Sequence, residues 1–394
     1  MNNENKLLSN APKWLLAVFP LVLLALLIVA FLTLNPLSFF TGAFPPLENL
    51  TIQAVTFPAE GEIELNIING GPDPVTIAQV LVDDAYWNFT ISDNTLDRLE
   101  TATINIPYMW VVDEPLVIRL LTSTGATFDA EVDIAIITPA PTGATFLAYA
   151  LLGIYVGVFP VILGMLWFPF MRQLDRKWMN AVLALTIGLL IFLFVDTLLE
   201  ALEIAEEIPS VFQGVPIVYL GAFVTLLILL TIGQQGNKEN SPLGVATLIA
   251  IGIGLHNFGE GLAIGAAFAT GAAALGSFLV VGFTLHNITE GVGIAAPLLR
   301  GEQPSLKTFF LLALLAGAPA ILGTWLGGLA FSPFWATLFL SIGAGAILQV
   351  IWEVGKLLMD AAKRVEQSAF TWLNFSGVFV GVLIMYLTAF LVKY

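Results

Sequence analysis

Residues 256–267 read HNFGEGLAIGAA and residues 286–297 read HNITEGVGIAAP, so the chain carries nearly the same polar phrase twice. Each copy interrupts a segment that is otherwise apolar. The chain has two histidines among its 394 residues, and each of them opens one copy. The question is why titratable side chains recur at matching positions within apolar segments.

The surrounding sequence is typical of a polytopic membrane protein. Hydrophobic residues make up 58% of the chain, charged residues 11%, and the mean hydropathy is +0.90, whereas a soluble domain is about a quarter charged. A bilayer-spanning helix needs about 20 consecutive apolar residues. The sequence predicts eight such spans, at roughly 144–170, 179–201, 215–233, 243–269, 272–298, 307–331, 333–357 and 371–391.

Two segments of different character precede these spans. Residues 14–34 form an apolar run that is long for a signal peptide and has no clear cleavage site after it, which favours an uncleaved anchor helix. Residues 44–140 carry stretches of β-branched residues, such as EIELNII, separated by turn signals, such as NGGPDP. They predict a small all-β, sandwich-like domain. We therefore expect an anchor in 1–43, a β domain in 44–140 and an eight-span bundle in 141–394.

The distribution of charge predicts the orientation of the chain in a cell membrane. Basic residues favour the cytoplasmic side, and those in the loops between the eight spans all fall in alternate loops: Arg172, Arg176, Lys177, Lys238, Arg300, Lys307, Lys363 and Arg364. The N-terminus is then cytoplasmic, and the β domain and the C-terminus are extracytoplasmic. Fifteen acids and two bases give residues 44–140 a charge of −13, out of −15 for the chain. Such acidity could gather cations outside, and a solvated surface is the alternative interpretation.

The two repeated phrases have the geometry of a metal site. A His and a Glu four residues apart share one helical face, as in His256 with Glu260 and His286 with Glu290. Each histidine lies fifteen residues from Gly271 in the turn between the fourth and fifth spans, or about 22 Å along a helix, which places both near mid-bilayer. Ionisable groups there are costly unless they pair or function, and two carboxylates would balance a divalent cation. A structural contact between helices is the alternative.

The glycines that follow each glutamate, Gly261 and Gly291, are expected to let the two helices approach closely. The chain has no cysteine, so disulfides and thiolate ligands are excluded. It also has no basic patch that could neutralise the phosphates of a nucleic acid.

With HNFGEGLAIGAAF and HNITEGVGIAAPL in consecutive spans, residues 144–394 resemble the ZIP (Zrt-, Irt-like protein) family of divalent metal transporters. The similarity is to its prokaryotic branch, in which the fourth and fifth spans both carry an HNxPEG-type motif. It implies a bundle of eight helices that moves zinc, or else iron, manganese or cadmium, toward the cytosol. The metal would be a substrate, with no organic cofactor and no enzymatic activity expected. The ligands implied by the resemblance are His256, Asn257, Glu260, His286, Asn287 and Glu290.

Four features depart from the family pattern. Gly259 and Thr289 stand where each motif usually has its proline. The sixth-span stretch LLAGAPAILGTW lacks the glutamate that completes a second metal site in related members, so a site for one ion or for two stays open. The loop between the third and fourth spans has no histidine, and the anchor and β domain are not part of the usual pattern.

Four more polar residues are candidates for a transport path. Asp196 and Glu200 lie near the outer end of the second span, where a cation could first be captured. Gln349 and Glu353 lie toward the cytoplasmic end of the seventh, where it could leave. Interhelical hydrogen bonding is the alternative for each pair. Pro160 and Pro319 predict kinks within spans.

Two other function classes remain open. An intramembrane metal-dependent hydrolase could use a glutamate as general base, although the HExxH spacing on one helix is absent. A non-transporting metal sensor or scaffold could bind a partner through the β domain. The partners expected are divalent metal ions and membrane lipid; a homodimer is left open, and the sequence identifies no partner for the β domain.

Overall fold

The computed structural model describes residues 13–34, 46–132, 134–235, 241–269, 273–299, 301, 303–363 and 368–392. The chain divides into two compact units, Met1–Leu47 and Glu48–Tyr394. The described part of the first unit contains one helix, α2 (Lys13–Leu34), which coincides with the predicted apolar run. Three of the basic residues that predict the orientation, and the glycine in the predicted turn between the fourth and fifth spans, lie outside the described residues: Lys238, Arg300, Arg364 and Gly271.

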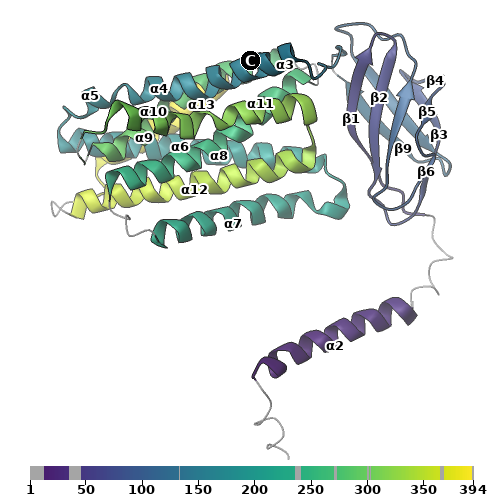
Figure 1. Ribbon diagram of the computed structural model, residues 1–394, viewed down its shortest axis with the longest axis horizontal. Coiled ribbons are helices and arrows are strands. Elements are labelled where there is room, and N and C mark those ends of the chain that lie inside the picture. The colour runs from purple at the N-terminus through teal and green to yellow at the C-terminus, as the bar shows by residue number, and fades with distance from the viewer. Residues whose placement is uncertain are drawn as a thin grey trace, which may run out of the picture. The chain divides into compact units, whose positions relative to one another are not determined.

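The first part of the second unit is a domain of two antiparallel sheets (Figure 1). The strand orders are β1-β2-β7-β5 and β4-β3-β8-β9, with β6 paired to β3. The strands are β1 (Leu50–Ala59), β2 (Glu62–Asn69), β3 (Val75–Val82), β4 (Ala85–Trp87), β5 (Thr90–Ile91), β6 (Thr95–Leu96), β7 (Thr101–Ile106), β8 (Leu116–Thr122) and β9 (Thr127–Val132).

One hydrophobic core joins the two sheets. Side chains alternate between the faces of a strand, and Leu65 of β2 and Ile104 of β7 in one sheet are buried in the same cluster as Ile77 of β3 and Ile118 of β8 in the other. The prediction of a small all-β domain is confirmed, and the pairing of its strands is antiparallel. The long first strand, β1, was not recognised in the sequence because register shifts interrupt its pairing with β2 and most of its residues are only half-buried.

Eight segments of the described chain are long and apolar enough to cross a membrane, and Figure 1 shows their helices lying side by side. The first comprises α3 (Gly143–Gly153), the π-helical turn η2 (Ile154–Val158), α4 (Phe159–Met165) and α5 (Phe168–Met171). The others are α6 (Arg176–Glu206), η3 (Ser210–Phe212) with α7 (Gly214–Gln235), α8 (Pro242–Ala269), α9 (Ala273–Leu298), α10 (Leu306–Gly317) with α11 (Pro319–Ala330), α12 (Pro333–Lys363) and α13 (Trp372–Val392). Each corresponds to one predicted span. The side of the membrane that each loop faces stays a prediction.

Two of the spans depart from regular α-helix near the prolines where kinks were predicted. In the first span, the π-helical turn η2 is followed by α4, whose second residue is Pro160. In the sixth, α10 ends at Gly317 and α11 begins at Pro319. Because proline has no backbone N–H, it cannot bond to the carbonyl four residues earlier. Each break therefore leaves backbone carbonyls that need another donor.

Glycines let these broken spans pack against α8 and α9. A Cβ atom on Gly261 of α8 would collide with the Ala320 carbonyl oxygen of the sixth span, and one on Gly291 of α9 would collide with the Val161 carbonyl oxygen of the first. The expectation that these glycines bring α8 and α9 together was therefore wrong. Each glycine lies one residue after its glutamate, about 100° further round the helix, so it faces a different neighbour.

Candidate metal centre

The two polar phrases lie at the centres of two adjacent helices. His256 is the fifteenth of the 28 residues of α8, and His286 is the fourteenth of the 26 residues of α9. Their ring centroids are 6.2 Å apart, as expected from equal depth on neighbouring helices. Among the two histidines and two glutamates, His286 is the most exposed, at 7%.

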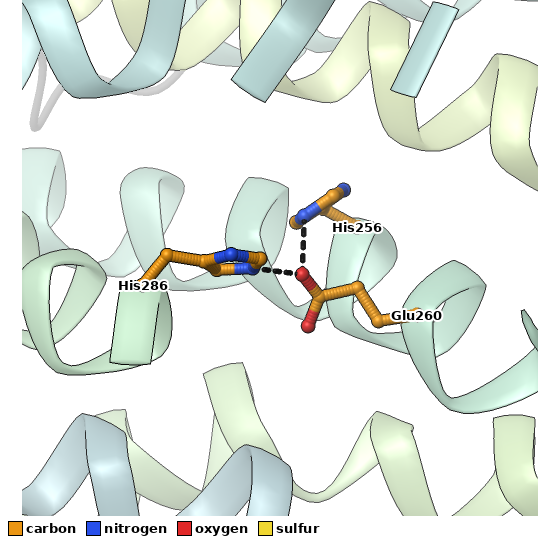
Figure 2. A group of neighbouring side chains, drawn as sticks. All are labelled: His256, Glu260 and His286. Atoms are coloured by element: carbon orange, nitrogen blue, oxygen red, sulfur yellow. Dashed lines mark hydrogen bonds and ion pairs between the residues drawn. The ribbon is translucent and has the colours of Figure 1, made fainter. Parts of the chain in front are cut away.

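Three of the six expected ligands converge on one point (Figure 2). Glu260 Oε1 lies 3.0 Å from His256 Nε2 and is also bonded to His286 Nε2. The ligand atoms of these three side chains all lie within 4.8 Å of one another. Zinc binds imidazole nitrogen and carboxylate oxygen at about 2.0–2.2 Å, so the ligand atoms around one tetrahedral ion are about 3.4 Å apart. The cluster is therefore close to the size that surrounds a single ion.

Glu290 places a second carboxylate beside this cluster. Its Oε1 lies 4.0 Å from His256 Nε2. It is 4% exposed, and neither carboxylate oxygen has a hydrogen-bond partner among the residues that the structure describes. Burying an ionised carboxylate without a partner is expensive. A bound cation would supply the missing partner.

Thr197 of α6 orients one of the imidazoles. Its Oγ1 lies 3.3 Å from His256 Nδ1, while Nε2 of the same ring faces Glu260. A partner on the second ring nitrogen is the usual means by which a metal-binding histidine is held in place. The sequence reasoning missed Thr197. Its signal was weak, since it lies between the candidates Asp196 and Glu200 but has an ordinary residue type for a span.

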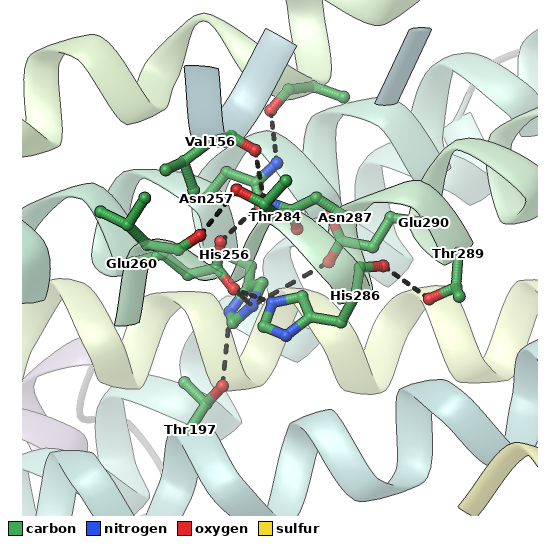
Figure 3. Close-up of polar contacts among 12 residues, drawn as sticks. Val156, Thr197, His256, Asn257, Glu260, Thr284, His286, Asn287, Thr289 and Glu290 are labelled. Carbon is green, nitrogen blue, oxygen red and sulfur yellow. Dashed lines mark hydrogen bonds and ion pairs between the residues drawn. The ribbon is translucent and has the colours of Figure 1, made fainter. Parts of the chain in front are cut away.

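The two asparagines donate to backbone carbonyls at the two helix breaks (Figure 3). Asn287 Nδ2 donates to the Val156 carbonyl of η2 and to Glu260 Oε2, both at 3.0 Å. Asn257 Nδ2 donates to the Ala316 carbonyl of α10, also at 3.0 Å. Their Oδ1 atoms are buried and have no hydrogen-bond partner in the described part of the chain. Both motif helices are thus fastened to a proline-broken span.

An open cavity of about 400 Å³ leads to the cluster from one side. It lies between α6, α9 and α13, and its lining runs along α9 from Leu275 to His286. Most lining side chains are apolar, and the polar ones are Asp196, His286 and Thr388. The structure therefore places the path candidate Asp196 in the same cavity as a candidate ligand.

The cavity on the opposite side of His286 is much smaller. The cavity there measures about 10 Å³ and is lined by His286, Thr289 and Glu290 together with apolar residues, which leaves room for about one water molecule. The other path candidates, Glu200, Gln349 and Glu353, line neither of these two cavities. Gln349 is fully buried in α12, and its amide atoms have no hydrogen-bond partner among the described residues.

Comparison with known proteins gives no functional assignment. The chain matches no protein-family model and no curated protein. Among solved structures it is similar to the archaellum periplasmic stator protein FlaG from Sulfolobus acidocaldarius, with 15% sequence identity and a TM-score of 0.20 over 22% of this chain and 99% of that chain. A likeness this small carries no argument about function.

Proposed function

We propose that the chain is a membrane transporter that moves divalent metal cations toward the cytosol, with Zn²⁺ as the first expected substrate and iron, manganese or cadmium as others. The observation that carries this proposal is Glu290. Its buried carboxylate has no hydrogen-bond partner among the described residues, and it lies beside two imidazoles and a second carboxylate, midway along two apolar helices.

The donor set suits the proposed substrate. Two imidazole nitrogens and two carboxylate oxygens are ligands that zinc accepts in tetrahedral sites. The two carboxylates balance the charge of a divalent ion, and all four side chains together can replace its hydration water. The resemblance to the ZIP family belongs to the same proposal, because the two HNxxEG phrases occupy the consecutive helices α8 and α9.

The cavities favour a carrier over an open channel. A cavity of about 400 Å³ reaches His286 from the side of Asp196, whereas the cavity beside Glu290 holds about 10 Å³. Unequal space on the two sides of the site is compatible with the alternating access of a carrier. We place the acidic β domain on the outer side, where it would gather cations. A membrane potential that is negative inside favours inward movement of a divalent ion by about 4.6 kcal/mol per 100 mV.

The direct test is metal influx into proteoliposomes that contain the full chain, compared with protein-free vesicles, across Zn²⁺, Cd²⁺, Mn²⁺ and Fe²⁺. We expect saturable influx, with the order of competition naming the preferred metal. Metal binding without influx would replace this proposal with a sensor or scaffold. Hydrolysis of a membrane substrate without metal flux would replace it with the hydrolase.

Replacing Asp196 by asparagine is expected to raise the half-saturating metal concentration about threefold to tenfold and to leave the maximal rate nearly unchanged. Asp196 lines the approach to His286, so removing its charge costs on the order of 1 kcal/mol of attraction for the arriving cation. The difference in half-saturating concentration between wild type and variant should shrink at high salt, because salt screens the attraction of Asp196 for the cation. Initial rates over a range of metal concentrations, at low and high ionic strength, measure it.

The matched control for Asp196→Asn is Thr388→Val, which changes a neutral polar side chain in the same cavity. Half-saturation should stay near the wild-type value in this variant. If Asp196→Asn also leaves half-saturation unchanged at low ionic strength, the cavity between α6, α9 and α13 is not the route of approach.

A further inference from the structure

The two motif asparagines make the same kind of contact at two separate places. Each amide nitrogen donates to one backbone carbonyl of a neighbouring span, Asn287 to Val156 and Asn257 to Ala316, at 3.0 Å in both cases. Both asparagines are fully buried. The repetition suggests that the contact is a requirement of the fold around the site.

We propose that Asn257 and Asn287 are positioning residues and that they do not bind the transported ion, which is held as a single ion by His256, Glu260, His286 and Glu290. The inference rests on the proposed function and specifies its site more closely: it fixes the ligand set and the number of ions.

Both carbonyls lie close to a proline that interrupts the helical hydrogen bonds of its span. Pro160 lies four residues after Val156 and has no N–H with which to complete that helical bond. Ala316 is in the last turn of α10, just before the break at Pro319, where helix carbonyls lack partners. A buried carbonyl without a donor is costly. The asparagine N–H groups therefore satisfy a need that the breaks create.

The acceptors determine which way each amide is turned. A backbone carbonyl can only accept a hydrogen bond, so the nitrogen of the amide has to face it. Both N–H bonds of Asn287 are used, one to Val156 and one to Glu260 Oε2. Exchanging Oδ1 and Nδ2 of Asn287 would break both bonds and bring oxygen against oxygen, so the two contacts fix the orientation of the amide.

Asn287 also aims the carboxylate of Glu260. It holds Oε2, which leaves Oε1 directed at the two imidazoles. Four ligand atoms then remain for the ion, two nitrogens and two oxygens. The stretch of the sixth span that faces Asn257, from Ala316 to Pro319, contains no acid that could help to hold a second ion.

The unpartnered Oδ1 atoms are what a ligand role would use, and Asn287→Asp separates the two roles because they predict opposite signs. A ligand would keep its oxygen and gain a charge, so the affinity for the metal would stay equal or rise. A positioning donor would lose both N–H groups and repel Glu260 and the Val156 carbonyl. We expect the affinity of the detergent-solubilised full chain for Zn²⁺, measured by titration calorimetry, to fall at least about tenfold.

The matched control is Asn374→Asp. Asn374 is a buried asparagine whose Nδ2 also donates to a backbone carbonyl, that of Ala369, at 2.8 Å. It lies in the first turn of α13, eleven residues or about 16 Å along that helix from Met385, which lines the cavities beside His286. Its substitution should leave Zn²⁺ affinity unchanged.

Asn257→Asp repeats the test at the second copy in case Asn287→Asp does not fold, and it too should weaken Zn²⁺ binding. The wild-type chain gives an independent reading with Co²⁺. Four ligands predict the intense visible absorption of a tetrahedral ion, whereas a weak six-coordinate spectrum would overturn the proposal. Equal or tighter Zn²⁺ binding by an aspartate variant would overturn the proposal that the asparagines are positioning residues, and would leave the proposed transport function unaffected. If the wild-type chain binds no metal, the proposed function fails as well.

Discussion

Metal influx is expected to fall to the level of protein-free vesicles when His256 and His286 are both replaced by alanine. The two substitutions remove every imidazole of the chain and both nitrogen ligands of the cluster. Each loss should weaken metal binding at least about tenfold, and the two together at least about a hundredfold. They also leave Glu260 and Glu290 in an apolar interior without the imidazoles that face them, which further disfavours the intact site.

Proteoliposome influx of Zn²⁺, normalised to the amount of folded protein, measures this loss. Thr284→Val is the matched control, because Thr284 lies two residues from His286 on α9 but its hydroxyl, among the residues that the structure describes, donates to the Val280 carbonyl of its own helix, at 2.6 Å. That variant should transport at close to the wild-type rate. Wild-type influx in the double histidine variant would show that the cluster is not the transport site, and would make the structural interpretation of the repeated phrase the better one.

The fold could be predicted from the sequence wherever the surroundings of a segment determine which residue types it contains. The eight apolar segments follow from hydropathy because a lipid-facing helix needs an unbroken apolar run, and the ends of the predicted 144–170 and of Gly143–Met171 differ by one residue each. Strands β2, β3, β7 and β8 follow from β-branched stretches with a buried face. The two-residue strands β5 and β6 were beyond this reasoning, because so few residues carry no periodicity.

The centre of the site was also predictable, since equal spacing from a turn brings two helical phrases to equal depth. What spacing could not give is the neighbour that each remaining face meets. Gly261 and Gly291 turned out to face the sixth and first spans, and Thr197 turned out to contact His256. These contacts depend on how helices far apart in the sequence pack together, and no local pattern encodes that packing.

Of the path candidates, Asp196 shares a cavity with His286, while Gln349 is buried in α12 and lines neither described cavity beside the cluster. Sequence reasoning treated both as polar residues at span ends. The two residues differ in what surrounds them: Asp196 faces a cavity between α6, α9 and α13, whereas Gln349 is enclosed by neighbouring helices. Asp196 is therefore the path candidate that we expect to act on the approach of the ion.

Glu290→Gln is expected to act on metal binding and on stability in opposite directions. Metal binding and influx should fall at least about a hundredfold, because one of two carboxylates that balance the divalent charge is lost. The metal-free protein should instead gain stability, by about 1–3 kcal/mol, since glutamine has nearly the same shape and removes a buried charge whose oxygens have no hydrogen-bond partner among the described residues.

Glu260→Gln is the matched comparison, because it makes the same chemical change four residues from His256 in the other motif. Glu260 accepts bonds from His256, His286 and Asn287, and hydrogen bonds to a charged group contribute about 1.5–3 kcal/mol each. Its neutralisation should therefore destabilise the metal-free protein. Thermal unfolding of the full chain in a metal chelator measures both variants. If Glu290→Gln unfolds at a higher temperature than wild type and Glu260→Gln at a lower one, the carboxylate of Glu290 binds a cation and does not stabilise the metal-free fold. If both variants unfold at a lower temperature, Glu290 is a satisfied structural residue, and the observation that carries the proposed transport function is lost.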